Sequence, residues 1–234
     1  MARESDRTWE IYDADIPFAG AVYGPQRARM AVIGLGGGAL LVVSPGVPVS
    51  DAKWEQLARW GTPRFLLAPN RYHSAGIRAW KERFPAATVV AHPRAHERLR
   101  KKVPGVAIED LAPLEAALPQ SVRIFSPPMA KQGETWVSVK TRDGAAWFVT
   151  DGIVNQERLP RGPLGLFLRL AGFRTRLMVN PFFKRLFLTD KAAFKAWASA
   201  ELESDTPALF VPSHGAPLRG SDLRARLQAA IDEA

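Results

Sequence analysis

The sequence predicts a layered α/β protein, an αββα sandwich in which two mixed β-sheets pack face to face and helices cover both outer sides. Three observations predict it. Hairpin patterns stand at both ends of the 234-residue chain, strands alternate with helices between them, and 47% of the residues are hydrophobic. Such a chain can bury one substantial core. Since no linker, repeat or low-complexity tract divides it, we expect a single domain over residues 1–234.

The first half of the chain begins with a hairpin and continues as strand–helix units. Strands are expected at 9–12 and 30–35, and a Gly36-Gly37-Gly38 turn leads into a returning strand at 39–44. Ser50 and Asp51 cap an amphipathic helix that ends at Gly61. The periodicity then predicts a strand at 64–68, a helix at 74–83, a strand at 88–91 and a helix at 94–102.

The second half returns to strands and closes with helices. Period-two alternation predicts strands at 106–108, 122–125, 135–140 and 145–149. A helix near 191–200, a strand at 208–211 and a helix at 221–231 complete the layers. Residues 157–188 differ from this pattern, because they mix large apolar side chains with seven Lys or Arg residues and one acid, Glu157.

The segment 157–188 is expected to be an insertion outside the core. Glycine and proline break it into short helices, and it leaves the chain near the end of a predicted strand. We predict a helical cap that forms an apolar pocket over that strand end and a homodimer contact. Peripheral binding to an anionic membrane surface is the alternative, because basic residues accompany the apolar ones.

Composition narrows the function. The absence of cysteine excludes disulfides and thiolate zinc sites. The first residues lack the apolar core of a signal peptide, and no apolar run reaches the roughly 20 residues that span a bilayer, so we expect a cytoplasmic protein without a transmembrane segment. The net charge is +9, but no nucleic-acid-binding motif accompanies it. We therefore predict no specific nucleic-acid partner.

Three apolar runs each end on a residue that can ligate a metal. His73 follows the run at 65–68, Asp151 follows 147–149, and His214 follows 209–212. Strand ends gather at one edge of a sheet, so we expect these side chains within about 8 Å of one another. Two imidazoles and one carboxylate suit zinc or iron(II) and leave coordination positions open for water or a small-molecule substrate.

The order of these motifs resembles the metallo-β-lactamase superfamily. Residues 65–93 are similar to its first metal motif with the following helix and strand, Thr150-Asp151-Gly152 to its bridging aspartate, and Pro212-Ser213-His214-Gly215 to its closing histidine motif. The resemblance covers the chain from about residue 30 to its end. It is strongest to an uncharacterised branch, and it implies the αββα sandwich fold.

The motif is degenerate. Against the superfamily pattern, Ala68 and Asn70 stand at the first two histidines, Tyr72 at the aspartate and Met129 near the next histidine. The resemblance therefore implies at most one metal, held by His73, Asp151 and His214. Tyr72 becomes the candidate catalytic residue, either as a weak fourth ligand or through a hydroxyl that orients water or a substrate oxygen.

Two functions remain open from the sequence. The first is a metal-dependent hydrolase of a small ester, lactone or phosphoester. The second is a catalytically inactive binding or interaction protein of the same fold that has lost its metals. In that case His73, Asp151 and His214 would hydrogen-bond one another, and Tyr72 would fill the space of the lost ligands. The metal content of the purified protein distinguishes the two.

Overall fold

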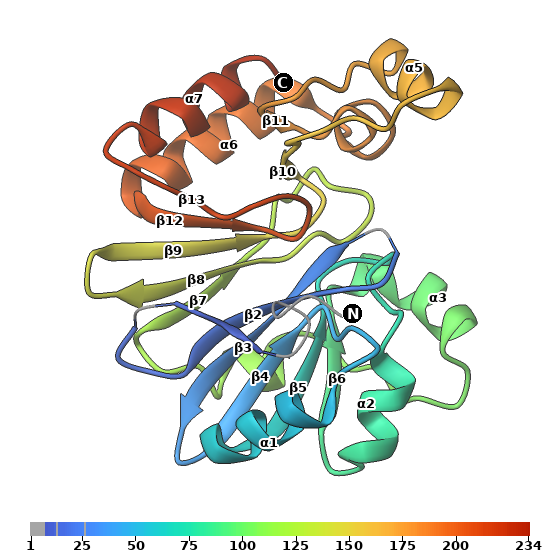
Figure 1. Cartoon of the computed structure of the whole chain (residues 1–234), viewed down its shortest axis with the longest axis vertical. Coiled ribbons are helices and arrows are strands. Elements are labelled where there is room, and N and C mark those ends of the chain that lie inside the picture. The colour runs from blue at the N-terminus through green and yellow to red at the C-terminus, as the bar shows by residue number, and fades with distance from the viewer. Residues whose placement is uncertain (1–7, 13, 26) are drawn as a thin grey trace.

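The computed structural model, which describes residues 8–12, 14–25 and 27–234, confirms the predicted layering. Two β-sheets face each other, and helices lie on the outer side of each sheet (Figure 1). Both sheets are mixed, with antiparallel and parallel pairs. Within the described residues, none of the helices has both the length and the apolar character needed to cross a bilayer.

The first sheet is built from the N-terminal half and has six strands. β1 to β4 pair antiparallel, whereas β4, β5 and β6 run parallel because helices connect them. In pairing order the strands are β1 (Glu10–Ile11), β2 (Phe18–Tyr23), β3 (Ala28–Gly36), β4 (Ala39–Val43), β5 (Thr62–Ala68) and β6 (Thr88–Ala91). The helices of this half are α1 (Asp51–Trp60), α2 (Ile77–Arg83), α3 (Pro93–Lys102) and the short α4 (Ala112–Glu115).

The second sheet has five strands, and its only parallel pair among the described residues is β9 with β12. In pairing order the strands are β13 (Leu218–Arg219), β12 (Pro207–Pro212), β9 (Gly144–Val149), β8 (Trp136–Thr141) and β7 (Val122–Phe125). Its outer side is covered by α6 (Lys191–Ser204) and α7 (Leu223–Asp232) (Figure 1).

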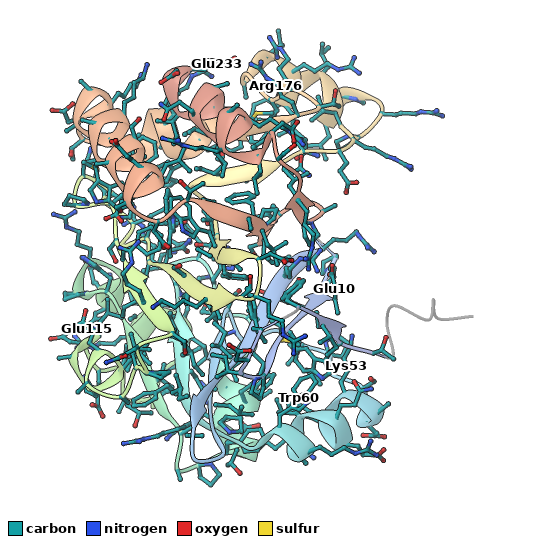
Figure 2. All side chains as sticks on the ribbon, turned by 90° about the vertical axis from the view of Figure 1, so that its left-hand side faces the viewer. Glu10, Lys53, Trp60, Glu115, Arg176 and Glu233 are labelled. Carbon is teal, nitrogen blue, oxygen red and sulfur yellow. The ribbon has the colours of Figure 1, made fainter. Side chains whose placement is uncertain are left out.

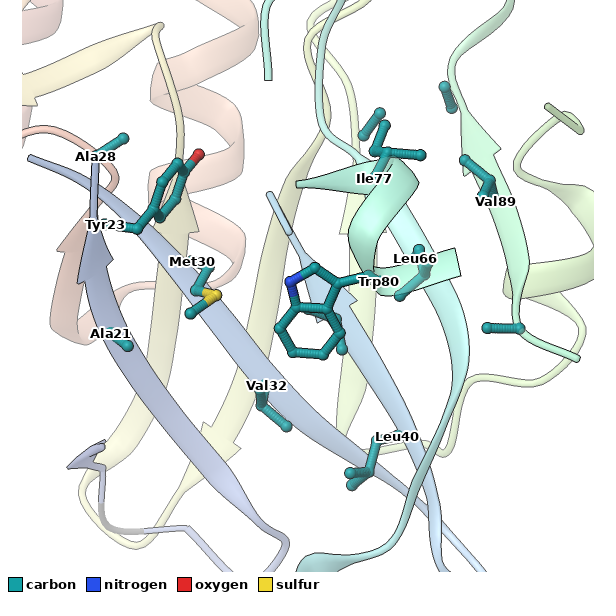
Figure 3. Packing of buried hydrophobic residues seen from close by; sticks show 14 of the residues in the cluster. Ala21, Tyr23, Ala28, Met30, Val32, Leu40, Leu66, Ile77, Trp80 and Val89 are labelled. Carbon is teal, nitrogen blue, oxygen red and sulfur yellow. The ribbon is translucent and has the colours of Figure 1, made fainter. Parts of the chain in front are cut away.

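Alternation along the strands assigns the apolar side chains to separate layers. Leu40 and Val42 pack toward the helices α1 to α3, whereas Leu41 and Val43 pack between the sheets. Trp80 of α2 is fully buried over the first sheet, with Val32 among its neighbours in Figure 3. Full burial of an aliphatic side chain such as Leu40 or Val42 contributes roughly 1.5–3 kcal/mol, so these layers supply much of the driving force for folding.

The sequence prediction differs from the structure at several strands, since the short strands at 153–155, 177–179 and 218–219 were not predicted. Residues 106–108 form no strand; instead, the next residue, Glu109, makes a single bridge to Val90 at the edge of β6. β2 was not predicted, because its small residues give a weak strand pattern. It pairs along its whole length with β3 and so extends the N-terminal hairpin into a meander.

The prediction that residues 157–188 lie outside the core is wrong for their second half. The segment contains α5 (Pro163–Leu170), then β11 (Leu177–Val179), which pairs with β10 (Ile153–Asn155), and a π-helical turn η2 (Phe183–Phe187). Leu177, Val179 and Phe183 are buried in the apolar cluster beneath α6 and α7. Arg176 pairs with Glu233 at the end of α7 (Figure 2). Within this segment, α5 projects from the rest of the molecule (Figure 1).

Candidate metal centre

Strand geometry brings two of the predicted ligands side by side. β9 and β12 run parallel, and their last aligned pair is Val149 with Pro212. Asp151 lies two residues after Val149, and His214 lies two residues after Pro212. The Ser213 amide donates to the Val149 carbonyl oxygen at 2.7 Å and keeps the two chain exits together. The parallel register therefore determines that these two side chains share one edge of the second sheet.

The first sheet supplies the third residue. β5 ends at Ala68, and the loop beyond it carries His73. The Ser213 side chain links the sheets here, because its hydroxyl donates to the Arg29 carbonyl oxygen at 2.9 Å. Gly215, next to His214, allows the chain to pass close to Asn155: its φ is +110°, and a Cβ there would lie 1.8 Å from the Asn155 carbonyl oxygen.

His73, Asp151 and His214 converge as the sequence predicts. One ligand atom from each lies within 4.8 Å of the others. Asp151 Oδ1 is 3.3 Å from His73 Nε2 and 3.2 Å from His214 Nε2. Ligand bonds to zinc are about 2.0–2.2 Å long, so three atoms at these separations can surround one ion. This nitrogen- and oxygen-donor set fits zinc or iron(II) and leaves positions for further ligands.

A buried hydrogen-bond chain orients His73. Its Nδ1 lies 2.7 Å from Ser44 Oγ, which lies 2.7 Å from the Tyr23 hydroxyl. When Nδ1 donates to Ser44, Nε2 is left free to bind a metal on the side of Asp151. Ser44 has a φ of 56° just after β4, a left-handed conformation that places its hydroxyl under the imidazole. It is completely buried and within hydrogen-bond distance of His73, so it helps to orient that side chain. Burial raises the pKa of Tyr23 to about 12, although the hydrogen bond with Ser44 acts to lower it, so the Tyr23 hydroxyl stays protonated.

Glu134 is a buried carboxylate that the sequence analysis missed. Its Oε1 accepts hydrogen bonds from the Thr150 hydroxyl at 2.7 Å and from the Asp151 and Gly152 amides at 2.8 and 2.9 Å. The Trp136 indole N–H donates to the same oxygen at 3.1 Å. Together these bonds hold the backbone on both sides of Asp151, so Glu134 determines where that ligand points.

The second oxygen of Glu134 connects to the site through Asn70. Asn70 Nδ2 is 2.9 Å from both Glu134 Oε2 and Asp151 Oδ2, and Gln132 Nε2 also donates to Oε2 at 2.7 Å. The Asn70 amide cannot turn over without loss, because its Oδ1 accepts from the Tyr72 amide at 2.8 Å. Asn70 is thus a bridge between two carboxylates at a position where the superfamily pattern has a histidine.

The electrostatics separate the two carboxylates. Burial opposes ionisation of Asp151, but His73 and His214 hold its pKa well below the usual range. Burial, together with the charge of Asp151, raises the pKa of Glu134, and the bonds from Thr150, Asn70 and Gly152 act in the opposite direction. Burial alone would lower the pKa of His73, yet the charge and hydrogen bond of Asp151 raise it above 6.5.

The segment that carries Met129 contributes a different residue to the site. Met129 does not face the three candidate ligands but is buried in the cluster under α6 and α7. The residue that reaches Asp151 from this segment is Glu134, five positions later. A sequence signal existed, since Glu134 is a lone acid just before the apolar strand β8. Ala68, at the other lost ligand position, is a core residue of β5.

Tyr72 lies beside the cluster and is 42% exposed. Its ring centroid is 5.4 Å from that of Phe187 and 4.7 Å from the Arg98 guanidinium carbon. With Asp151 it lines an apolar cavity of about 380 Å³, whose other walls come mostly from the second half of the 157–188 segment. These walls are formed by Gln132, Asn180, Phe182, Phe183, Leu186 and Phe187. Residues 180–187 therefore form most of the wall of an apolar cavity that borders Asp151.

Comparison with known proteins identifies the fold. No family model matches the chain, and no curated protein matches it in sequence. The structure resembles the metallo-β-lactamase FIM-1 from Pseudomonas aeruginosa in its mono-zinc form, with a TM-score of 0.59 and 14% identity over 97% of this chain and 95% of that chain. The DIM-1 metallo-β-lactamase gives a TM-score of 0.58 and 13% identity over 97% of each chain.

A flavodiiron protein shows the same likeness. The Flv1 flavodiiron core from Synechocystis sp. PCC6803 has a TM-score of 0.58 and 13% identity over 97% of this chain, and the chain spans 61% of the length of that protein. Identities this low carry the fold alone. The protein has the metallo-β-lactamase fold, and at its site the fold brings together a His-Asp-His cluster that can hold a metal.

Proposed function

We propose that this protein is a mononuclear metal-dependent hydrolase of a small ester, lactone or phosphoester. The observation that carries the proposal is the convergence of His73, Asp151 and His214 within 4.8 Å on a metallo-β-lactamase fold. A zinc or iron(II) ion bound there supplies Lewis-acid chemistry and the activation of water near neutral pH. The mono-zinc form of FIM-1 supports the one-metal stoichiometry.

The residues around the cluster have separate roles in this proposal. Ser44 holds the His73 imidazole with Nε2 toward Asp151. Glu134 and Asn70 hold Asp151, each through a hydrogen bond of 2.8–2.9 Å. Tyr72, on the wall of the apolar cavity, donates a hydrogen bond from its hydroxyl to a substrate oxygen. The cavity binds the apolar part of the substrate and excludes water.

The surroundings favour one metal over two. Both oxygens of Glu134 already accept hydrogen bonds, six in all, so this carboxylate has no lone pair directed toward a second ion. Asn70 turns its amide nitrogen, a donor, toward both carboxylates. The side chains at the degenerate positions therefore complete a hydrogen-bond network and do not form a second ligand set.

The alternative is an inactive binding protein of the same fold. It is supported by the ion pairs that Asp151 makes with His73 and His214, because these satisfy the polar groups of the cluster by themselves. Elemental analysis of protein purified without a chelator or metal-affinity tag decides between the two. We expect one zinc or iron per chain and its loss in His73→Ala and His214→Ala.

Hydrolysis tests the activity directly. The metal-loaded protein should cleave at least one member of a panel of esters, lactones and phosphoesters, and Tyr72→Phe should lower kcat while metal content stays the same. Two equivalents of tightly bound metal would contradict the one-metal site. A metal-free protein that stays inactive after zinc or iron is added would favour the binding-protein function.

The exposed face of α5 supports a proposed membrane partner. Leu164, Leu166, Phe167 and Leu170 are 56–76% exposed, and Leu186 of η2 is 59% exposed. Basic residues surround them, and the only acid within residues 157–188 is Glu157. A homodimer through this face would bring like charges together, whereas anionic lipid headgroups would complement them. Peripheral contact with an anionic membrane surface is therefore the proposal, and a homodimer is the other outcome of its test.

A further inference from the structure

A second cavity borders His214, one of the candidate metal ligands. It has a volume of about 630 Å³, and His214 and Gly215 form part of its wall. Three arginines line it: Arg27 and Arg29 from the start of β3, and Arg158 from the chain beyond β10. The single acid in its lining is Glu157, so this cavity is positively charged. The remaining lining residues are Val22, Asn155, Gln156 and Ala216.

Arg29 is a buried part of the wall of this cavity. It is 6% exposed, pairs with Glu10, and directs Nη2 toward the Gly215 carbonyl oxygen at 3.4 Å. Its Nε is buried and makes no hydrogen bond within the part of the chain that the structure describes. The guanidinium is thus held by the fold next to the His214 loop, and the exposed Arg27 and Arg158 are the arginines of this wall that can meet an oxyanion.

Each of the two cavities borders one of the candidate metal ligands. Asp151 lines the apolar cavity and His214 lines the basic one. The facing atoms of these residues, Oδ1 and Nε2, are only 3.2 Å apart. A molecule whose reactive bond lies at the cluster therefore extends into an apolar space on one side and a cationic space on the other.

From this arrangement we infer that the substrate is an amphipathic anion: an ester with an oxyanion group on one side of the scissile bond and an apolar chain on the other. The inference rests on the proposed hydrolase function. The oxyanion is a carboxylate or a phosphate, which the exposed Arg27 and Arg158 bind, and the chain lies against Tyr72 and Phe182. Hydrolysis adds one water across the ester C–O bond and releases a carboxylic acid and an alcohol.

Recognition is tested first, without catalysis. Protein freed of metal with a chelator, so that no ion can bind the probe, is titrated calorimetrically with mono-octyl succinate and with its neutral methyl ester. A phosphate arm uses 1-octanoylglycerol 3-phosphate. We expect the anions to bind about tenfold more tightly than the neutral diester, and this preference to shrink at high salt. Monomethyl succinate, which lacks the chain, should bind weakly.

Variants locate the two halves of the site. Arg27 and Arg158 are exposed, so the double variant Arg27→Glu/Arg158→Glu should fold and lose the preference for the anion. Arg224→Glu, an exposed charge reversal on α7, is the matched control and should bind like the wild type. Leu186→Ser, in the apolar cavity, should weaken binding of the octyl probes only. Equal binding of neutral and anionic probes, or an unchanged double variant, overturns the inference.

Hydrolysis by the metal-loaded protein separates this inference from the proposed function. If the anionic octyl esters bind selectively but no ester is cleaved, recognition of the amphipathic anion stands and the hydrolase proposal fails. If neutral and anionic esters are cleaved with equal kcat/KM, the hydrolase proposal stands and the inference fails. Whichever of the two anionic probes is preferred, the carboxylate or the phosphate, identifies the oxyanion.

Discussion

Replacing Glu134 with glutamine tests whether this buried carboxylate holds Asp151 in place. Glutamine has nearly the same shape but carries one oxygen and one NH₂ group. The better orientation keeps the oxygen where Oε1 accepts from the Trp136 indole, the Thr150 hydroxyl and two backbone amides. The NH₂ group then faces Asn70 Nδ2 and Gln132 Nε2, which are themselves donors.

The expected cost follows from those contacts. Two hydrogen bonds to a charged acceptor are lost, at about 1.5–3 kcal/mol each, or about 3–6 kcal/mol together. Removing a desolvated charge offsets part of this, since burying an ion carries a penalty of several kcal/mol. We expect a net loss of about 2–3 kcal/mol in the free energy of unfolding of the metal-free protein. Because Asn70 loses its bond to Glu134, it holds the Asp151 carboxylate less firmly, and zinc affinity should also fall, by about 10–100-fold.

Urea denaturation of the metal-free protein and zinc titration against a competing chelator measure these two effects. Glu97→Gln is the matched control, because Glu97 lies on the surface of α3 and its replacement should change neither quantity. The reasoning is refuted if Glu134→Gln is as stable as the wild type and binds zinc as tightly. Stability lost without any change in zinc affinity would show that Glu134 supports the fold and not the ligand.

Three further predictions follow from other parts of the structure. The pKa of His73 is raised above 6.5 in the folded state, so its contribution to the stability of the metal-free protein should be complete below about pH 6.5. That contribution should be lost as the pH rises through the raised pKa. Denaturation curves measured across this pH range should show the loss in the wild type and not in His73→Gln. Ser44→Gly suits the φ of 56° but removes the bond to His73 Nδ1, so zinc affinity should fall about 10–100-fold while Ser126→Gly, outside the site, leaves it unchanged. The double variant Leu166→Glu/Leu170→Glu should no longer co-sediment with anionic vesicles, and its behaviour with neutral vesicles should be unchanged. If the variant instead has a lower mass than the wild type by light scattering, the face is a homodimer contact.

Much of the architecture and the candidate ligand set could be predicted from the sequence, because both depend on local periodicity. Leu40 to Val43 form a continuous apolar run, which predicts a strand buried on both faces, and the structure distributes them between two apolar layers. His73, Asp151 and His214 each follow an apolar run, and strand ends share an edge whatever the details of the loops. The weak strand β2, made of small residues, is where this local signal failed.

The surroundings of the site were decided by tertiary structure. Glu134 reaches Asn70 across 64 positions, Ser44 reaches His73 across 29, and Arg29 lies beside Gly215 across 186. Whether such pairs meet depends on which strands become neighbours and in which register, and no local pattern encodes that. The same reason explains residues 177–188: their apolar side chains were visible in the sequence, but only the pairing of β11 with β10 shows that they enter the core and cover the site.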